Sequence, residues 1–233
     1  MNEESNLSEW LNRPQVLTGE RRKPLVLISY ASSLDGSISV KQGSQFTISS
    51  DESMKTVHYL RSRCDAILVG IGTILSDNPQ LSVRLVSGKD PVPVIIDSSL
   101  RTPSDSRVFL DSRNPLIFCG RKPDSGRKNK LLNKGAFIIE TDNNEETLSL
   151  TDVLFQLYDR GIRSLMVEGG AKIIRSFIKE SLWDKMAVSI APSLIGGYRI
   201  ITENTLTEPV RFNNVSWIRK GSDQICLIER ETS

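Results

Sequence analysis

The sequence predicts an α/β fold in which helices flank a mixed, mainly parallel central sheet, with an antiparallel hairpin at the C-terminus. Two observations carry this prediction. Several apolar runs are continuous rather than alternating, which is typical of parallel strands buried on both faces, and helical stretches separate some of these runs. In addition, the apolar segments 212–219 and 224–229 flank the turn Lys220-Gly221-Ser222-Asp223, an arrangement typical of a hairpin.

Residues 1–23 are polar and charged, and we expect them to form a tail with one helical turn. Residues 24–233 are predicted to form a single domain, because a chain of this length buries a sufficient core without disulfides or metals. The first strand is expected at 24–30. Asp35-Gly36 then predicts a turn before a short strand at 37–40, since glycine accepts a positive φ angle.

A helix is predicted from Ser49 to about Ser62. Ser49 and Glu52 have the spacing of a capping box, in which each side chain satisfies a free backbone N–H group of the first turn. His58 and Arg61 lie on the apolar stripe of this helix. We expect Arg61 either to point into a cleft or to extend its charge to the surface. A lone helical histidine is more often a packing residue than a catalyst.

The remaining elements follow from the same two periodicities, which are those of the strand and the helix. Strands are predicted at 66–69, 92–97, 116–119, 136–139, 164–167 and 185–191, and helices at about 150–160 and 171–179. The segments that separate the strands between 97 and 136 are rich in Ser, Pro, Gly and Arg, and are expected to be loops.

Composition argues against several classes of function. The 30 basic and 28 acidic residues give a net charge of +2, so no global field favours nucleic acid or an anionic membrane as the main partner. One histidine and no Cys-x-x-Cys motif are too few ligands for a usual zinc site, and no metal is expected. Three widely spaced cysteines indicate reduced thiols, and no secretory signal or long apolar run is present, so we expect a cytoplasmic protein.

Two predicted strands run into glycines at their carboxyl ends. Gly70-Ile71-Gly72-Thr73 follows one strand, and Glu168-Gly169-Gly170 follows another and opens a helix. The free N–H groups at the start of that helix suit an anion such as the phosphates of a dinucleotide. Because open α/β sheets bind ligands at the carboxyl ends of their strands, the two junctions predict a site for a nucleotide and a second ligand. The simpler alternative is that the glycines only permit a tight turn and close helix packing.

Several ordered motifs together resemble one family. They are Ser33-Leu34-Asp35-Gly36, Leu60-Arg61, Asp65 to Thr73, Asp77 to Arg84, Ile96-Asp97-Ser98, Val167 to Gly170 and Ala191-Pro192. In this order, over residues 24–230, they are similar to the reductase domain of bacterial riboflavin biosynthesis and to the stand-alone pyrimidine reductases of archaea and fungi. The resemblance implies a dihydrofolate-reductase-like fold and a homodimer. It also implies NADPH-dependent reduction of a ribosylamino-pyrimidine 5′-phosphate to its ribitylamino product, with hydride going to C1′ of the ring-opened imine.

The resemblance further implies roles for individual residues. Substrate-contacting positions are Gln45, Arg61, Leu81, Arg84 and Glu168. Cofactor-contacting positions are Ala31, Thr47, Gly72, Thr73, Asp77, Ser98, Gly169, Gly170, Ala171, Lys172 and Ile173. The arginines suit a 5′-phosphate, because charge-assisted hydrogen bonds are strong. Asp77 and Glu168 are the candidates for relaying a proton to the imine nitrogen, although positioning is the role favoured for both. At Gln45 and Thr47 the chain departs from the bacterial pattern, which often has serine and tryptophan there.

Alternatives to this function stay open at the level of sequence. One is a related reductase that acts on a pterin or another small imine, because a fold does not fix a substrate. Another is a non-catalytic homologue that retains nucleotide binding. For the pyrimidine reductase itself, the sequence does not distinguish a substrate with a 2-amino ring from one with a 2-oxo ring.

Overall fold

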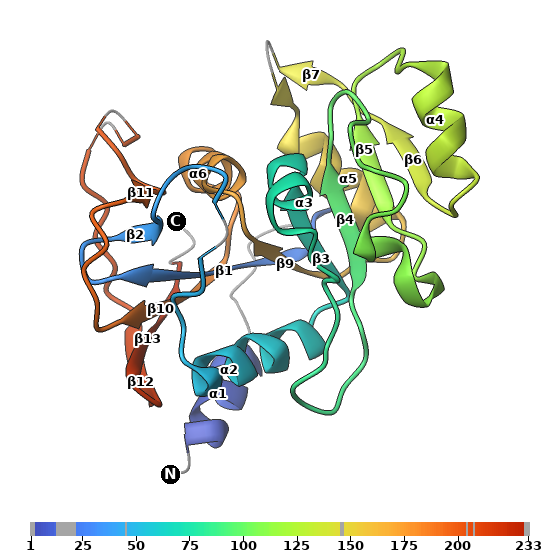
Figure 1. The fold of residues 1–233 in the computed structure, drawn as a ribbon. Helices are drawn as coiled ribbons and strands as arrows, with labels where there is room; N and C mark the ends of the chain where they lie inside the picture. The colour runs from blue at the N-terminus through green and yellow to red at the C-terminus, as the bar shows by residue number, and fades with distance from the viewer. Residues whose placement is uncertain are drawn as a thin grey trace.

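The computed structural model describes residues 3–12, 22–44, 46–144, 147–203, 205–206 and 208–230. Its centre is a sheet of nine strands (Figure 1). In spatial order these are β12 (Val215–Lys220), β13 (Asp223–Glu229), β10 (Lys185–Ala191), β1 (Leu25–Ser33), β9 (Ser164–Glu168), β3 (Ala66–Gly70), β4 (Val92–Ile96), β5 (Leu116–Cys119) and β6 (Phe137–Glu140). From β10 to β6 all neighbours are parallel, whereas β13 pairs antiparallel with both β10 and β12. The predicted mixed, mainly parallel sheet with a C-terminal hairpin is confirmed.

Helices cover both faces of this sheet. On one face lie α5 (Leu150–Asp159) and α6 (Ala171–Lys179). On the other face lie α3 (Ile71–Asp77) and α4 (Ser125–Leu132), and beside them α1 (Glu3–Asn12) and α2 (Asp51–Ser62). The connecting segments contain the two-stranded pairs β2 (Ser37–Ser39) with β11 (Tyr198–Arg199) and β7 (Asn143–Asn144) with β8 (Thr147–Leu148), and a 3-10 helix at Arg107–Ser112.

Strand β3 shows why the apolar runs are continuous. Ala66 and Leu68 belong to the core beneath α5 and α6, whereas Ile67 and Val69 belong to the core on the opposite face. Successive side chains of a strand point to opposite faces, so a strand covered on both sides is apolar throughout. The same expectation is wrong for β6. Phe137 is 57% exposed because β6 is the last strand of the sheet.

Helix α2 begins later than predicted. Ser50, not Ser49, is its N-cap, and the Ser50 hydroxyl accepts a hydrogen bond from the N–H of Ser53 (3.3 Å). Asp223, the first residue of β13, accepts hydrogen bonds from the Ser50 N–H (2.8 Å) and hydroxyl (3.2 Å). The C-terminal hairpin therefore fixes the start of the helix that carries Arg61.

Three short elements were not predicted: α3, and, where loops were expected, α4 and the 3-10 helix at Arg107–Ser112. Helix α4 has a clear local start, because the carboxylate of Asp124 caps the N–H of Arg127 (2.8 Å). Its only buried residue is Leu131. A helix without an apolar stripe gives no periodic signal, so the sequence pattern does not reveal it.

The expectation of an N-terminal tail is wrong for residues 3–12. They form α1, a helix of ten residues, in which Leu7 is 3% and Trp10 is 2% exposed. Lys185 of β10 is fully buried and donates hydrogen bonds to the carbonyls of Trp10 and Leu11, which satisfies acceptors at the end of α1. Leu7 and Trp10 therefore belong to the core. Residues 13–21, the rest of the expected tail up to Arg22, lie outside the described residues.

Replacing Trp10 by alanine should lower the free energy of unfolding by about 3–5 kcal/mol, the usual cost of deleting a buried aromatic side chain. Phe137→Ala is the control, because an exposed side chain at the sheet edge should contribute less than about 1 kcal/mol. Urea unfolding followed by circular dichroism measures both variants. Equally small effects would show that α1 does not stabilise the sheet.

Candidate active site

A cleft of about 660 Å³ lies where β1, β3, β4 and β9 reach their carboxyl ends. Every described residue to which the resemblance gives a cofactor role lines it. These residues are Ala31, Thr47, Gly72, Thr73, Asp77, Ser98, Gly169, Gly170, Ala171, Lys172 and Ile173. Arg61 and Glu168 line it as well. The two strand-to-glycine junctions of the sequence thus meet in one cleft.

The two junctions are packed against each other. Gly169 and Gly170 have φ angles of +72° and +74°, and a Cβ atom on either would lie about 3.1 Å from the side chain of Thr73. A Cβ on Gly70 would lie 2.7 Å from Cγ1 of Ile173 in α6. Side chains at these glycines would force the β3 and β9 junctions apart, so close approach accounts for the glycines.

The start of α6 offers free hydrogen-bond donors to the cleft. Gly170 is the N-cap residue and supplies no side-chain cap, so the first N–H groups of the helix have no capping acceptor there. Ala171, Lys172 and Ile173 of this first turn line the cleft. Free N–H groups, the positive end of a helix and a lysine together favour an anion.

Arg61 and Glu168 form a buried ion pair at the edge of the cleft. Nε of Arg61 donates to Oε1 of Glu168 (2.7 Å) and Nη2 donates to Oε2 (2.6 Å), while Nη1 donates to the carbonyl of Ser82 (3.1 Å). The two side chains are only 9% and 12% exposed. Burial alone would lower the pKa of Arg61, but the Glu168 carboxylate outweighs this effect and raises it. Contacts with Glu168 and Ser82 therefore fix the position of the Arg61 guanidinium.

Two of the other three substrate positions, Leu81 and Arg84, are not among the residues that line this cleft. Leu81 is 2% exposed and packs in the core beneath α3. Arg84 is exposed, and its Nη1 donates to the hydroxyl of Ser82 (2.8 Å). Gln45 lies outside the described residues. The substrate roles of these residues stay predictions.

Arg84 belongs to a cluster of positive charge. Burial, and then the charges of Arg61, Arg107 and Arg113, lower the pKa of Arg84, while Asp90 opposes them. Carboxylates balance part of this charge, Glu168 at Arg61 and Asp90 and Asp111 at Arg113, but the neighbouring guanidinium groups still repel the charge of Arg84. An anion bound at Arg84 would relieve that repulsion, so this surface favours a phosphate over a neutral ligand.

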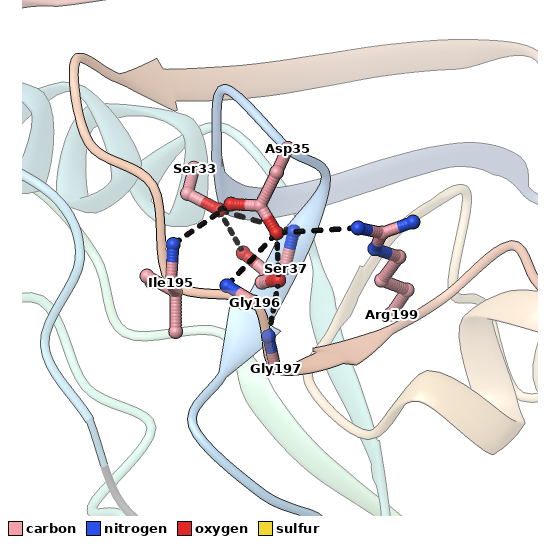
Figure 2. Close-up of polar contacts among 7 residues, drawn as sticks. All are labelled: Ser33, Asp35, Ser37, Ile195, Gly196, Gly197 and Arg199. Atoms are coloured by element: carbon pink, nitrogen blue, oxygen red, sulfur yellow. Dashed lines mark hydrogen bonds and ion pairs between the residues drawn. The ribbon is translucent and has the colours of Figure 1, made fainter.

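A network centred on Asp35 holds one wall of the cleft (Figure 2). The Asp35 carboxylate accepts hydrogen bonds from the hydroxyls of Ser33 (2.6 Å) and Ser37 (2.5 Å) and from the N–H groups of Ile195 (2.9 Å) and Gly196 (3.1 Å), and it pairs with Arg199 (3.4 Å). The hydrogen bonds from the serine hydroxyls, followed by those from the backbone, hold the pKa of Asp35 well below its usual range. The network joins β2 to β11, whose Ile38, Ser39 and Tyr198 line the cleft.

Sequence reasoning did not assign a role to several lining residues. Met54 and Val57 of α2 are partly buried and line the cleft beside Arg61. They share the apolar stripe on which Arg61 and His58 lie, so the stripe was the only available signal. Tyr198 gives no local signal, because it reaches the cleft through the pairing of β11 with the distant β2. Phe46, which also lines the cleft, lies in an irregular segment.

The structure contains no grouping of His, Cys, Asp and Glu side chains suited to a metal ion among the residues it describes. No helix in the described part of the chain is long and apolar enough to cross a membrane.

Residues 24–226 match the model of the RibD C-terminal domain family. The chain belongs to this family. It is 38% identical to the 2,5-diamino-6-ribosylamino-4(3H)-pyrimidinone 5′-phosphate reductase of Methanothermobacter thermautotrophicus, an alignment that covers 75% of this chain and 81% of that protein. This RibD C-terminal domain chain is also 32% identical to the riboflavin biosynthesis protein RibD of Aquifex aeolicus, over 90% of its own length but 59% of that relative.

A solved structure extends the likeness to three dimensions. The riboflavin biosynthesis reductase Rib7 of Saccharomyces cerevisiae has a TM-score of 0.76 to this chain at 24% identity, covering 96% of this chain and 99% of Rib7. At this level of identity the match shows a shared fold. The family and fold expected from the ordered motifs are therefore confirmed.

Glu168→Gln should destabilise the protein by about 3 kcal/mol, because it leaves the buried Arg61 charge without its counter-ion. Adding Arg61→Met should recover part of this loss, since the double variant buries no unpaired charge. Asp142→Asn is the control. It breaks a pair with Arg121 whose side chains are 59% and 74% exposed, so we expect little change in stability. Urea unfolding of the wild type and the three variants gives the free energies of unfolding. A loss for Glu168→Gln no larger than that for Asp142→Asn would contradict a buried, paired Arg61 charge.

Proposed function

We propose that this chain is an NADPH-dependent reductase that converts the ribosyl group of a ribosylamino-pyrimidine 5′-phosphate to the ribityl group. The relative in Methanothermobacter thermautotrophicus carries the name of such a phosphate reductase. The observation that supports the proposal most is the cleft itself. Backbone donors and glycines of two strand ends gather there beside a buried Arg61–Glu168 pair, with cationic side chains close by.

The residues present fit a dinucleotide cofactor. The nine-residue helix α6 begins at the cleft without a side-chain cap, so its N–H groups and Lys172 would hold the phosphates. Gly169 and Gly170 leave room that a Cβ atom would reduce, and Thr73 and Ser98 add hydroxyls to the same wall. When bound, NADPH supplies the hydride. The protein supplies orientation and excludes water.

The two carboxylates of the cleft, Glu168 and Asp77, differ in the contacts that they already make within the protein. Glu168 already accepts two hydrogen bonds from Arg61, and these bonds orient that arginine. Asp77 is half-buried at the end of α3 and forms no ion pair with any residue that the structure describes. We therefore assign Glu168 to positioning, and Asp77 to moving a proton towards the imine nitrogen of the substrate.

The cationic surface at Arg84 separates this function from the alternatives. A reductase of pterins or other uncharged imines has no use for Arg84 in a cluster with Arg107 and Arg113, whereas a 5′-phosphate does. A non-catalytic homologue would bind NADPH without turnover. The homodimer and the cytoplasmic location expected from the sequence stay part of this proposal.

Purified protein should oxidise NADPH in the presence of a ribosylamino-pyrimidine 5′-phosphate. The loss of absorbance of the reduced nicotinamide measures the reaction. The 2-amino and 2-oxo substrates are assayed side by side, and product analysis identifies the ribityl group. A dephosphorylated substrate serves as the control and should react with a higher KM, because it lacks the charge that the arginines favour. Absence of turnover with both phosphates would refute the proposal.

Gly170→Ala should weaken NADPH binding by about tenfold or more, because a side chain at the start of α6 reduces the space for phosphates. Gly161→Ala is a matched control. Gly161 also has a positive φ angle, +86°, but no atom lies within 4 Å of its added Cβ, and it does not line the cleft. Both variants place an alanine at a positive φ angle. Calorimetry should therefore show a change in NADPH affinity for Gly170→Ala only, and equal affinities would exclude the α6 site.

A further inference from the structure

The segment from Gln80 to Arg84 has no regular secondary structure, yet its backbone is held at each residue. Arg113 donates hydrogen bonds to the carbonyls of Gln80 and Leu81, the latter at 2.8 Å. Three other side chains also hold the segment. Arg61 donates a hydrogen bond to the carbonyl of Ser82 (3.1 Å). Asp90 accepts one from the N–H of Val83 (2.6 Å), and His58 accepts one from the N–H of Arg84 (2.9 Å). An irregular segment fixed in this way is already ordered before a ligand arrives.

His58 is the anchor of Arg84 itself. It lies on α2, one turn before Arg61, and it is 1% exposed. Its Nδ1 accepts the hydrogen bond from the N–H of Arg84, so Nδ1 is bare and the imidazole proton resides on Nε2. The side chain is therefore used as a hydrogen-bond acceptor within the protein.

The surroundings of His58 keep it neutral. Burial, and then the positive charges of Arg61 and Arg84, lower its pKa to about 4, while Asp90 acts in the opposite direction. At neutral pH the ring therefore carries no charge, and its bare Nδ1 stays available to the Arg84 N–H. Protonation of Nδ1, below about pH 4, would turn this hydrogen-bond acceptor into a donor.

We propose that His58 is a positioning residue for the substrate phosphate, acting by fixing the backbone from which the Arg84 guanidinium projects. This inference rests on the proposed function, in which Arg84 binds the 5′-phosphate. The Arg84 side chain is itself held by the Ser82 hydroxyl, and the Ser82 carbonyl is held by Arg61. His58 and Arg61, both on α2, thus set the place of Arg84 relative to the cleft.

Two amide substitutions separate positioning from packing. In His58→Asn the side-chain oxygen can occupy the place of Nδ1 and accept the Arg84 N–H, whereas in His58→Gln the amide reaches towards the place of Nε2. We expect His58→Gln to raise the KM for the pyrimidine phosphate about tenfold, with kcat and NADPH affinity unchanged. His58→Asn should stay within about threefold of the wild type. Equal KM values in the two variants would overturn the proposal.

A double variant tests whether His58 acts through Arg84. Arg84→Ala should raise the same KM by about tenfold or more, since it removes a charged hydrogen bond to the phosphate. In this background His58→Gln should cause little further change, because the two residues contribute to one contact. Additive effects would show that His58 does not act through Arg84, and would also overturn the proposal.

The unmodified protein offers a measurement that does not depend on the folding of any variant. The sequence contains one histidine, so the nitrogen-15 spectrum of the imidazole needs no assignment. We expect a proton on Nε2, a bare Nδ1 and no titration above pH 5. A proton on Nδ1, or titration near pH 6.5, would contradict the proposal. A failure of the proposed function is distinguishable, because it appears as absent turnover in the wild type.

Discussion

The ion pair between Arg61 and Glu168 is the interaction on which the geometry of the cleft depends. It joins helix α2, on one face of the sheet, to the carboxyl end of β9, where the chain turns into α6. Nη1 of the same arginine reaches the Ser82 carbonyl, so three separate segments meet at one guanidinium. A buried ion pair contributes little net stability compared with apolar packing, but removing one partner is costly. Its main effect here is therefore to fix positions.

The surface around this pair is of two kinds. Towards α6, in the cleft, it is made of backbone: glycines, free N–H groups and a tight contact with Thr73. Towards the segment 80–84, beyond the cleft lining, it carries charged side chains that hold one another and the chain between them. Backbone N–H groups suit the phosphates of a cofactor, because the fold fixes the direction in which each N–H group points. Side-chain cations add full positive charges, which suit a second phosphate group.

Much of this arrangement could be predicted from local patterns. The strands around β3 and the helices α5 and α6 follow from apolar periodicity, and the glycines mark both strand ends. The rest depends on contacts between distant residues. The capping-box spacing of Ser49 and Glu52 predicts a cap at Ser49, whereas the structure has Ser50 as the cap, held by Asp223 of the C-terminal hairpin. Two apolar residues, Leu7 and Trp10, are too few to predict a helix from sequence. The structure shows that the buried Lys185 holds the end of α1 on the sheet by donating hydrogen bonds to its carbonyls. His58 looks like a packing residue until its partner, 26 positions away, is seen.

The contact between Thr73 and the two glycines of the second junction also constrains how this family of sequences can vary. Positions 73, 169 and 170 share one small volume, although about a hundred residues separate the first from the others. A larger side chain at any one of them must be compensated at another. These positions should therefore change together or remain fixed together, and redesign of cofactor preference would have to treat them as one unit.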